Sequence, residues 1–158
     1  MSATPLSVSS LKGTANFIAL GAGLGLAPKA PGTFGTLLGI PLLLLMPHNL
    51  IAYTVIVVVL FALGVWCCDV CAKNLGVHDH PGIVWDEVVG YLITMAAVPR
   101  DIWWLLAGFA VFRFFDIIKP WPISWVDKQV HGGLGIMLDD ALAAVFALIV
   151  MQIAVRFF

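Results

Sequence analysis

The chain has 158 residues, of which 61% are hydrophobic and 11% are charged. Its mean hydropathy is +1.04, and its apolar share exceeds the roughly 45–50% of soluble domains, which favours a membrane protein. The net charge of −1, without any run of lysines or arginines, excludes a basic nucleic-acid-binding surface. The length suits one domain over residues 1–158, and no secretory signal is expected at the N-terminus.

Apolar stretches predict the helices in chain order. Residues 16–26 are apolar, rich in glycine and too short to span, so we expect an interfacial or re-entrant helix. Residues 34–46 form a short candidate span containing Pro41, which is expected to kink or tilt it. Residues 50–68 form the clearest span, since about 20 helical residues cross the hydrocarbon layer. Residues 83–98, 101–118 and 141–158 supply three more. The sequence therefore predicts an all-α, polytopic membrane bundle with about five spans.

Spans joined by short loops alternate in direction, and this alternation sorts the basic residues. One side of the membrane collects Lys12, Lys29, Lys73, Arg113, Lys119 and Lys128. The other side holds only Arg100 and Arg156. The positive-inside rule makes the first side cytoplasmic. The six tryptophans also fall near predicted span ends, as in an aromatic belt.

Six of the nine carboxylates lie in three short patches within very apolar sequence. The patches hold Asp79, Asp86 and Glu87 in DHPGIVWDEVVG, Asp116 in FRFFDIIKPWP, and Asp139 and Asp140 in GGLGIMLDDALAA. A carboxylate within a span costs roughly 2.5–3.5 kcal/mol on insertion scales and usually marks a site or a pathway. All three patches fall on the predicted cytoplasmic side, so we expect them to form one cation site. Asp101 and Asp127 lie outside them and are expected to matter little for activity.

Structural roles remain open for several of these acids. Asp86 and Glu87 begin a predicted helix, where the helix dipole favours negative charge. Asp139 is placed to cap the last predicted helix. Asp116 lies three residues after Arg113, so the two side chains can form an ion pair on one helix face.

Hard oxygen ligands suit Mg²⁺, Mn²⁺ or Ca²⁺, whereas zinc prefers more histidine and cysteine. Magnesium usually takes one or two carboxylates together with phosphate oxygens, so acids beside cations suit a phosphate ester. Candidate metal ligands are Asp79, Asp86, Glu87, Asp116, Asp139 and Asp140. Candidate phosphate-binding residues are Lys29, Thr33, Arg113 and Lys119. Candidate catalytic residues are Asp86, Glu87, Asp116, His78 and His80.

The loop APKAPGTFGT carries two of the phosphate-binding candidates, Lys29 and Thr33. Its glycines and threonines precede a helix, so backbone N–H groups are placed to cradle phosphate oxygens, although a plain turn is equally open. His78 and His80 flank Asp79 and are candidates to donate a proton to a leaving alkoxide or to bind phosphate. A surface-loop role without chemistry is the alternative for both histidines.

Four blocks in this order, APGTFGT, GIVWDEVVG, FRFFDIIKPWPI and GGLGIMLDD, resemble the signature blocks of the phosphatidylglycerophosphatase A family and cover residues 30–140. The resemblance implies an all-helical, magnesium-dependent lipid phosphatase of the bacterial inner membrane. Such an enzyme converts phosphatidylglycerophosphate to phosphatidylglycerol, with membrane lipids as its surroundings. What the family implies carries over to Asp86, Glu87, Asp116, Lys119, Asp139 and Asp140. It does not assign which acid binds metal and which does chemistry.

Other phosphatase chemistries lack their motifs. No arginine stands six residues after any cysteine, no Asp-x-Asp follows a strand-like run, and no Pro-Ser-Gly-His block is present. A metal-activated water remains as the nucleophile, with an attacking carboxylate as the alternative. A small ion or proton transporter using intramembrane carboxylates is the alternative function. The oligomeric state is left open.

Overall fold

The computed structural model describes residues 6–77 and 80–158, and over these residues it contains helices and loops but no strand. The all-α prediction is therefore confirmed for the described part of the chain. The elements, with η for a 3-10 helix, are η1 (Val8–Leu11), α1 (Thr14–Ala19), η2 (Gly21–Leu26), α2 (Pro31–Leu45), α3 (Leu50–Leu75), α4 (Trp85–Thr94), α5 (Ile102–Ile118), α6 (Ile123–Gln129) and α7 (Gly132–Phe157).

Local capping residues set several helix ends. The Asn49 side chain accepts a hydrogen bond of 2.9 Å from the backbone N–H of Ala52 and so begins α3. Gly76 ends the same helix in the left-handed conformation that glycine adopts most easily. Asp101 begins α5 by accepting from two backbone N–H groups of its first turn. These helix boundaries follow from capping hydrogen bonds and backbone preferences of residues that are close together in the sequence.

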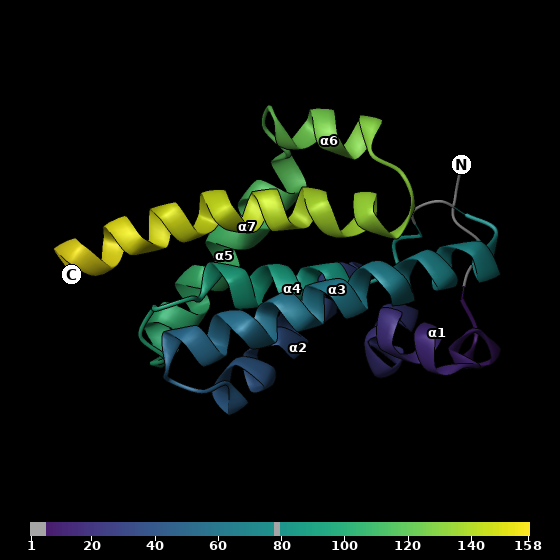
Figure 1. Ribbon diagram of the computed structural model, residues 1–158, viewed down its shortest axis with the longest axis horizontal. Helices are drawn as coiled ribbons and strands as arrows, with labels where there is room; N and C mark the ends of the chain where they lie inside the picture. The colour runs from purple at the N-terminus through teal and green to yellow at the C-terminus, as the bar shows by residue number, and fades with distance from the viewer. Residues whose placement is uncertain (1–5, 78–79) are drawn as a thin grey trace.

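The helix α4 lies at the centre of the bundle. Seven of its ten residues are buried, and it packs against α2, α3, α5 and α7. The long helices α3 and α7 lie side by side and run in opposite directions (Figure 1). Glycine permits the close packing on α4: a Cβ at Gly39 of α2 would lie 2.8 Å from Cδ1 of Tyr91. The helix α4 is thereby held tightly against α2.

Two helices, α3 and α7, are long and apolar enough to cross a membrane. Each has 26 residues, about 39 Å at 1.5 Å per residue, against roughly 30 Å of hydrocarbon. Only 17% of the most apolar stretch of α3 is buried inside the protein, compared with 50% for α7. Large apolar side chains such as Ile51 and Val58 are therefore exposed on α3, which favours contact with lipid.

The other helices predicted as spans are shorter than the hydrocarbon layer requires. The span expected over residues 83–98 contains only the 10 residues of α4, about 15 Å, which is half the hydrocarbon thickness. The chain leaves the helix after Thr94 and turns through Ala97, whose φ is 57°. The helices α2 and α5 have 15 and 17 residues. The described residues thus offer two candidate spans, and the arrangement with five spans stays a prediction.

Several boundaries also differ from prediction. The helix α7 begins at Gly132, not near residue 141, and α3 continues to Leu75, because each runs on to its capping residue beyond the apolar stretch. The short helix α6 was not predicted. The expected helix over residues 16–26 is split at Leu20 into α1 and η2, and η2 itself is interrupted at Ala22 and Gly23, where φ is positive. Its interfacial or re-entrant placement stays a prediction.

Candidate active site

A cavity of about 240 Å³ lies among the first turn of α2, the start of α4, the end of α5 and the first half of α7. Seven of its twelve lining residues are charged: Asp86, Glu87, Arg113, Asp116, Lys119, Asp139 and Asp140. The structure therefore brings together five of the six acids that the sequence groups into three patches. The sixth, Asp79, lies outside the described residues, as does His78.

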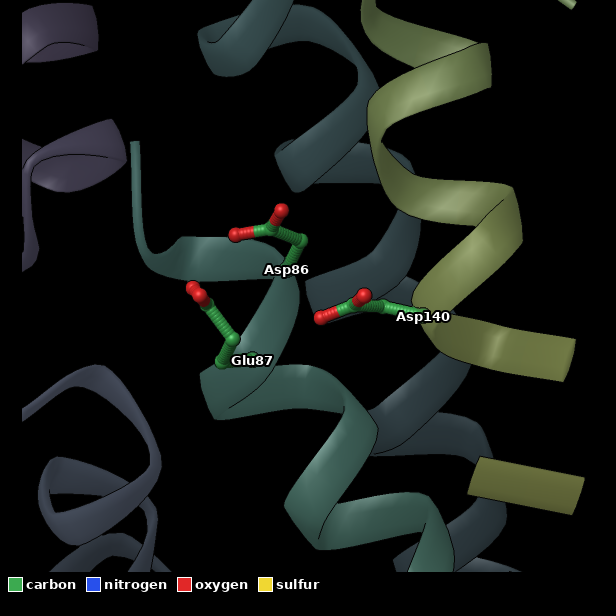
Figure 2. A group of neighbouring side chains, drawn as sticks. All are labelled: Asp86, Glu87 and Asp140. Atoms are coloured by element: carbon green, nitrogen blue, oxygen red, sulfur yellow. The ribbon is translucent and has the colours of Figure 1, made fainter. Parts of the chain in front are cut away.

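Three carboxylates form the tightest group in this cavity. Asp86 and Glu87 come from the first turn of α4, and Asp140 comes from α7. Each offers an oxygen, and these three oxygens all lie within 4.8 Å of one another. Figure 2 shows the Asp140 carboxyl group directed from α7 toward the first turn of α4. Asp86 and Asp140 are only 9% and 3% exposed, so the group is enclosed by protein.

Two buried carboxyl oxygens in this group receive no hydrogen bond from the described residues. Within residues 6–77 and 80–158, nothing donates a hydrogen bond to Glu87 Oε2 or Asp140 Oδ2. Burial, together with the neighbouring Asp140 carboxylate, raises the pKa of Glu87 to about 8. The negative charges of Asp116 and Asp86 also act on Asp140 and disfavour its ionised form. A divalent cation would compensate the missing hydrogen-bond donors, the burial and the mutual repulsion of these carboxylates. Oxygen ligands of this kind match Mg²⁺.

Arg113 connects the end of α5 to this group. Its guanidinium hydrogen-bonds to Asp116 one turn later, and its Nη1 lies 3.7 Å from Glu87 Oε1. The backbone of α2 approaches closely, because a Cβ at Gly32 would lie 2.1 Å from Glu87 Oε1. The Arg113–Asp116 ion pair that the spacing left open is therefore present. Arg113 thus contacts two acids of the site, Asp116 and Glu87.

Lys119 occupies the opposite rim of the cavity. It follows the last residue of α5 in the left-handed conformation, with φ of 44°. Its ammonium donates hydrogen bonds to Asp139 of α7 and, at 2.7 Å, to Asp127 Oδ1 of α6. Burial disfavours the charged amine, but the two carboxylates outweigh that effect and hold the pKa of Lys119 above its usual value. The Lys119 side chain therefore keeps its positive charge at this rim.

Asp139 and Asp140 serve different parts of the site. The capping role considered for Asp139 is wrong, because α7 begins at Gly132, with His131 as its N-cap. Both acids lie in the third turn of the helix. Consecutive helical residues point about 100° apart, so Asp140 reaches the α4 carboxylates while Asp139 reaches Lys119.

Three predicted site residues lie apart from the cavity. Lys29 is exposed and does not line it. Thr33 also lies outside the lining, and its backbone N–H donates to the Ala30 carbonyl at 3.0 Å, closing the first turn of α2. His80 is buried, and its Nδ1 accepts a hydrogen bond of 3.0 Å from the Gly82 N–H. The first turn of α2 contributes Ala30, Pro31 and Gly32 to the lining instead.

Sequence reasoning missed Asp127. It stands eight residues after Lys119 in a segment that was expected to be a loop, and the structure places it on α6 with its carboxylate on that lysine. The structure therefore gives no support to the expectation that Asp127 matters little for activity. A lysine and an acid flanking a Pro-Trp-Pro segment were the only sequence signal for this contact.

A family model described as phosphatidylglycerophosphatase A matches residues 17–155. The chain belongs to the phosphatidylglycerophosphatase A family. The match includes every residue of the described cavity and confirms the resemblance seen in the four sequence blocks.

Named relatives of this family cover most of the chain. A protein of Escherichia coli named phosphatidylglycerophosphatase A is 47% identical over 136 residues, which are 84% of this chain and 78% of the relative. One of Haemophilus influenzae with the same name is 45% identical over 93% of this chain and 92% of its own length. A third, from Bacteroides thetaiotaomicron, is 39% identical over 87% of this chain and bears the provisional name phosphatidylinositol-3-phosphatase. No solved structure matches the chain.

Proposed function

We propose that the protein is a phosphatidylglycerophosphatase, which hydrolyses phosphatidylglycerophosphate to phosphatidylglycerol and inorganic phosphate. The observation that carries this proposal is the cavity in which the carboxylates of Asp86, Glu87 and Asp140 gather beside two cations, Arg113 and Lys119. Acids for a divalent metal next to cations for phosphate are what a phosphomonoester requires. The names of the Escherichia coli and Haemophilus influenzae relatives supply the substrate.

Asp86, Glu87 and Asp140 are the residues that would hold Mg²⁺, since their oxygens are the closest together and two of them have partnerless buried atoms. When bound there, Mg²⁺ would neutralise phosphate oxygens and make a water molecule more acidic. Asp116 and Asp139, which the sequence also offered as ligands, are engaged by Arg113 and Lys119. They are better placed to orient those cations than to bind the metal.

The remaining residues of the cavity bind and orient the phosphate monoester. Lys119 supplies a positive charge at the rim, and Arg113 supplies one at the floor, where it also fixes the Glu87 and Asp116 carboxylates. Water attacks phosphorus as the bond to the glycerol oxygen breaks. A carboxylate of the cavity would take the proton that the water loses and pass it to the departing glycerol oxygen, so that phosphatidylglycerol and inorganic phosphate remain.

We further propose that α3 and α7 cross the bacterial inner membrane and that the cavity faces the cytoplasm. The first turn of α4 and the third turn of α7 place the acids toward one end of the α3–α7 pair. In the five-span arrangement that the sequence predicts, six of the eight basic residues fall on the same side, as the positive-inside rule requires of a cytoplasmic face. A lipid anchored by its acyl chains presents its terminal phosphate at that level.

Phosphate release from purified protein in mixed micelles tests the function. We expect release from phosphatidylglycerophosphate in Mg²⁺ and none in EDTA, with slower release from phosphatidic acid and phosphatidylinositol 3-phosphate. Asp86→Asn and Asp140→Asn are each expected to lower turnover about 100-fold or more, whereas Asp101→Asn, at the start of α5 and outside the cavity, is the control. Undiminished release by both site variants would refute the assignment. Ion flux through proteoliposomes without hydrolysis would favour the transporter instead.

A further inference from the structure

Lys119 is held between two carboxylates that come from different helices. Its ammonium donates to Asp139 on the inner side and to Asp127 Oδ1, at 2.7 Å, on the outer side. The Asp139 side chain is 6% exposed and that of Asp127 is 34% exposed, with Lys119 intermediate at 27%. The exposure of the three side chains therefore increases from Asp139 through Lys119 to Asp127. Asp127 reaches the lysine from α6, which packs on α7 (Figure 1).

A lysine in this position needs a second partner to keep its charge at the rim. The side chain has several rotatable bonds and ends in a compact point charge, so its partners decide where the ammonium lies. Asp139 and the acids behind it all attract the ammonium inward. Asp127 is the more exposed of the two partners and holds the amine by a second hydrogen bond, of 2.7 Å. With Asp127 neutralised, the ammonium would be drawn inward toward the acids of the cavity and would pair with Asp139 alone.

The packing of α6 does not require the Asp127 carboxylate. The buried residues of this helix are Ile123 and Val126, and these apolar side chains face the bundle. Asp127 accepts no hydrogen bond that would cap α6, because Pro122 occupies the N-cap position. The neighbouring Lys128 is largely exposed. The role of the Asp127 carboxylate is therefore its contact with Lys119.

We propose that Asp127 is a positioning residue that keeps the Lys119 ammonium at the rim of the cavity, where it binds the entering phosphate monoester. This inference rests on the proposed function and extends it to a residue that does not itself line the cavity. Asp127 acts on the phosphate only through Lys119. Its contribution must then disappear when the lysine is absent, which makes the inference testable by a double-mutant cycle.

The cycle compares Asp127→Asn, Lys119→Ala and the double variant with the wild-type protein. We expect Asp127→Asn to lower kcat/KM for phosphatidylglycerophosphate about tenfold, mostly through a higher KM, as the loss of one charge-assisted contact predicts. In the Lys119→Ala background, the same substitution should change kcat/KM less than twofold. Asp127→Glu keeps the charge and should recover most of the activity. Asp69→Asn removes the carboxylate partner of an exposed lysine, Lys73, held at 2.6 Å outside the cavity, and is the matched control.

Losses that multiply in the double variant would overturn the inference, since they would mean that Asp127 acts independently of Lys119. Wild-type kcat/KM in Asp127→Asn would overturn it as well. The same four proteins are compared for binding of inorganic phosphate in Mg²⁺ by calorimetry. If the wild-type protein hydrolyses no phosphatidylglycerophosphate, the proposed function fails, and the binding cycle still decides the role of Asp127. If hydrolysis is normal but the cycle is additive, only the inference on Asp127 fails.

Discussion

Gly32 offers a direct test of whether Glu87 belongs to the metal site, because the backbone of α2 limits where that carboxylate lies. An alanine at position 32 would place its Cβ 2.1 Å from Glu87 Oε1 and 3.0 Å from Glu87 Cδ. Contacts below 3.0 Å are not tolerated, so the carboxylate must retreat by about 1 Å. The group that moves is the end of a side chain, not backbone. Folding should therefore survive, with a loss of no more than about 1 kcal/mol in unfolding free energy.

The catalytic effect of this shift should be much larger than its effect on stability. A displacement of about 1 Å in a group that positions a reacting centre can cost 10²-fold in rate. We expect Gly32→Ala to lower turnover about 100-fold and to raise the Mg²⁺ concentration needed for half-maximal activity. The assay is phosphate release over a Mg²⁺ titration, paired with thermal unfolding of the same samples.

Gly39 of the same helix is the matched control. A Cβ there would lie 2.8 Å from Cδ1 of Tyr91, a packed ring that does not line the cavity. Gly39→Ala should cost roughly 1–3 kcal/mol in unfolding free energy and leave the Mg²⁺ half-saturation unchanged. If Gly32→Ala keeps wild-type turnover and Mg²⁺ half-saturation, Glu87 is not a ligand, and the reasoning from the α2 contact is refuted.

Three further outcomes follow from the described contacts. Arg113→Lys replaces the planar guanidinium, which contacts two acids, with a compact ammonium. Phosphate release should therefore slow about tenfold or more, while the unfolding temperature changes little. Tyr53→Phe removes a hydrogen bond of 2.5 Å to a buried carbonyl of α4, and chemical unfolding should show a loss of about 1–3 kcal/mol with kcat preserved. Single cysteines introduced at Asn49 and Lys128 should be labelled from outside intact cells only at position 49, and the reversed pattern would contradict a cytoplasmic cavity.

Composition and local sequence determined much of this protein. The apolar stretches identified the all-α class. They also placed the starts of the helices that follow Asn49 and Asp101 to within one residue, because capping depends on a few neighbouring residues. The rarity of carboxylates in apolar sequence predicted which acids belong to the site. It did so because burying an unpaired charge is too costly to occur without a partner or a role.

Only the tertiary structure decided how those acids are divided. Asp139 and Asp140 are adjacent in sequence, yet one pairs with Lys119 and the other joins the α4 carboxylates, because α7 begins early enough to carry both in its third turn. Lys29 and Thr33 matched a phosphate loop in sequence, but the first turn of α2 aims other residues at the cavity.

Asp127 and the length of α4 depended on contacts between segments far apart in the chain. A seven-residue helix such as α6 is too short to show a periodic pattern, so its acid was assigned to a loop. The apolar residues after Thr94 resemble a continuing span, and only the turn at Ala97 shows that the helix stops in the middle of the bundle. Hydrophobicity records which residues avoid water, but it does not distinguish burial by lipid from burial by neighbouring helices.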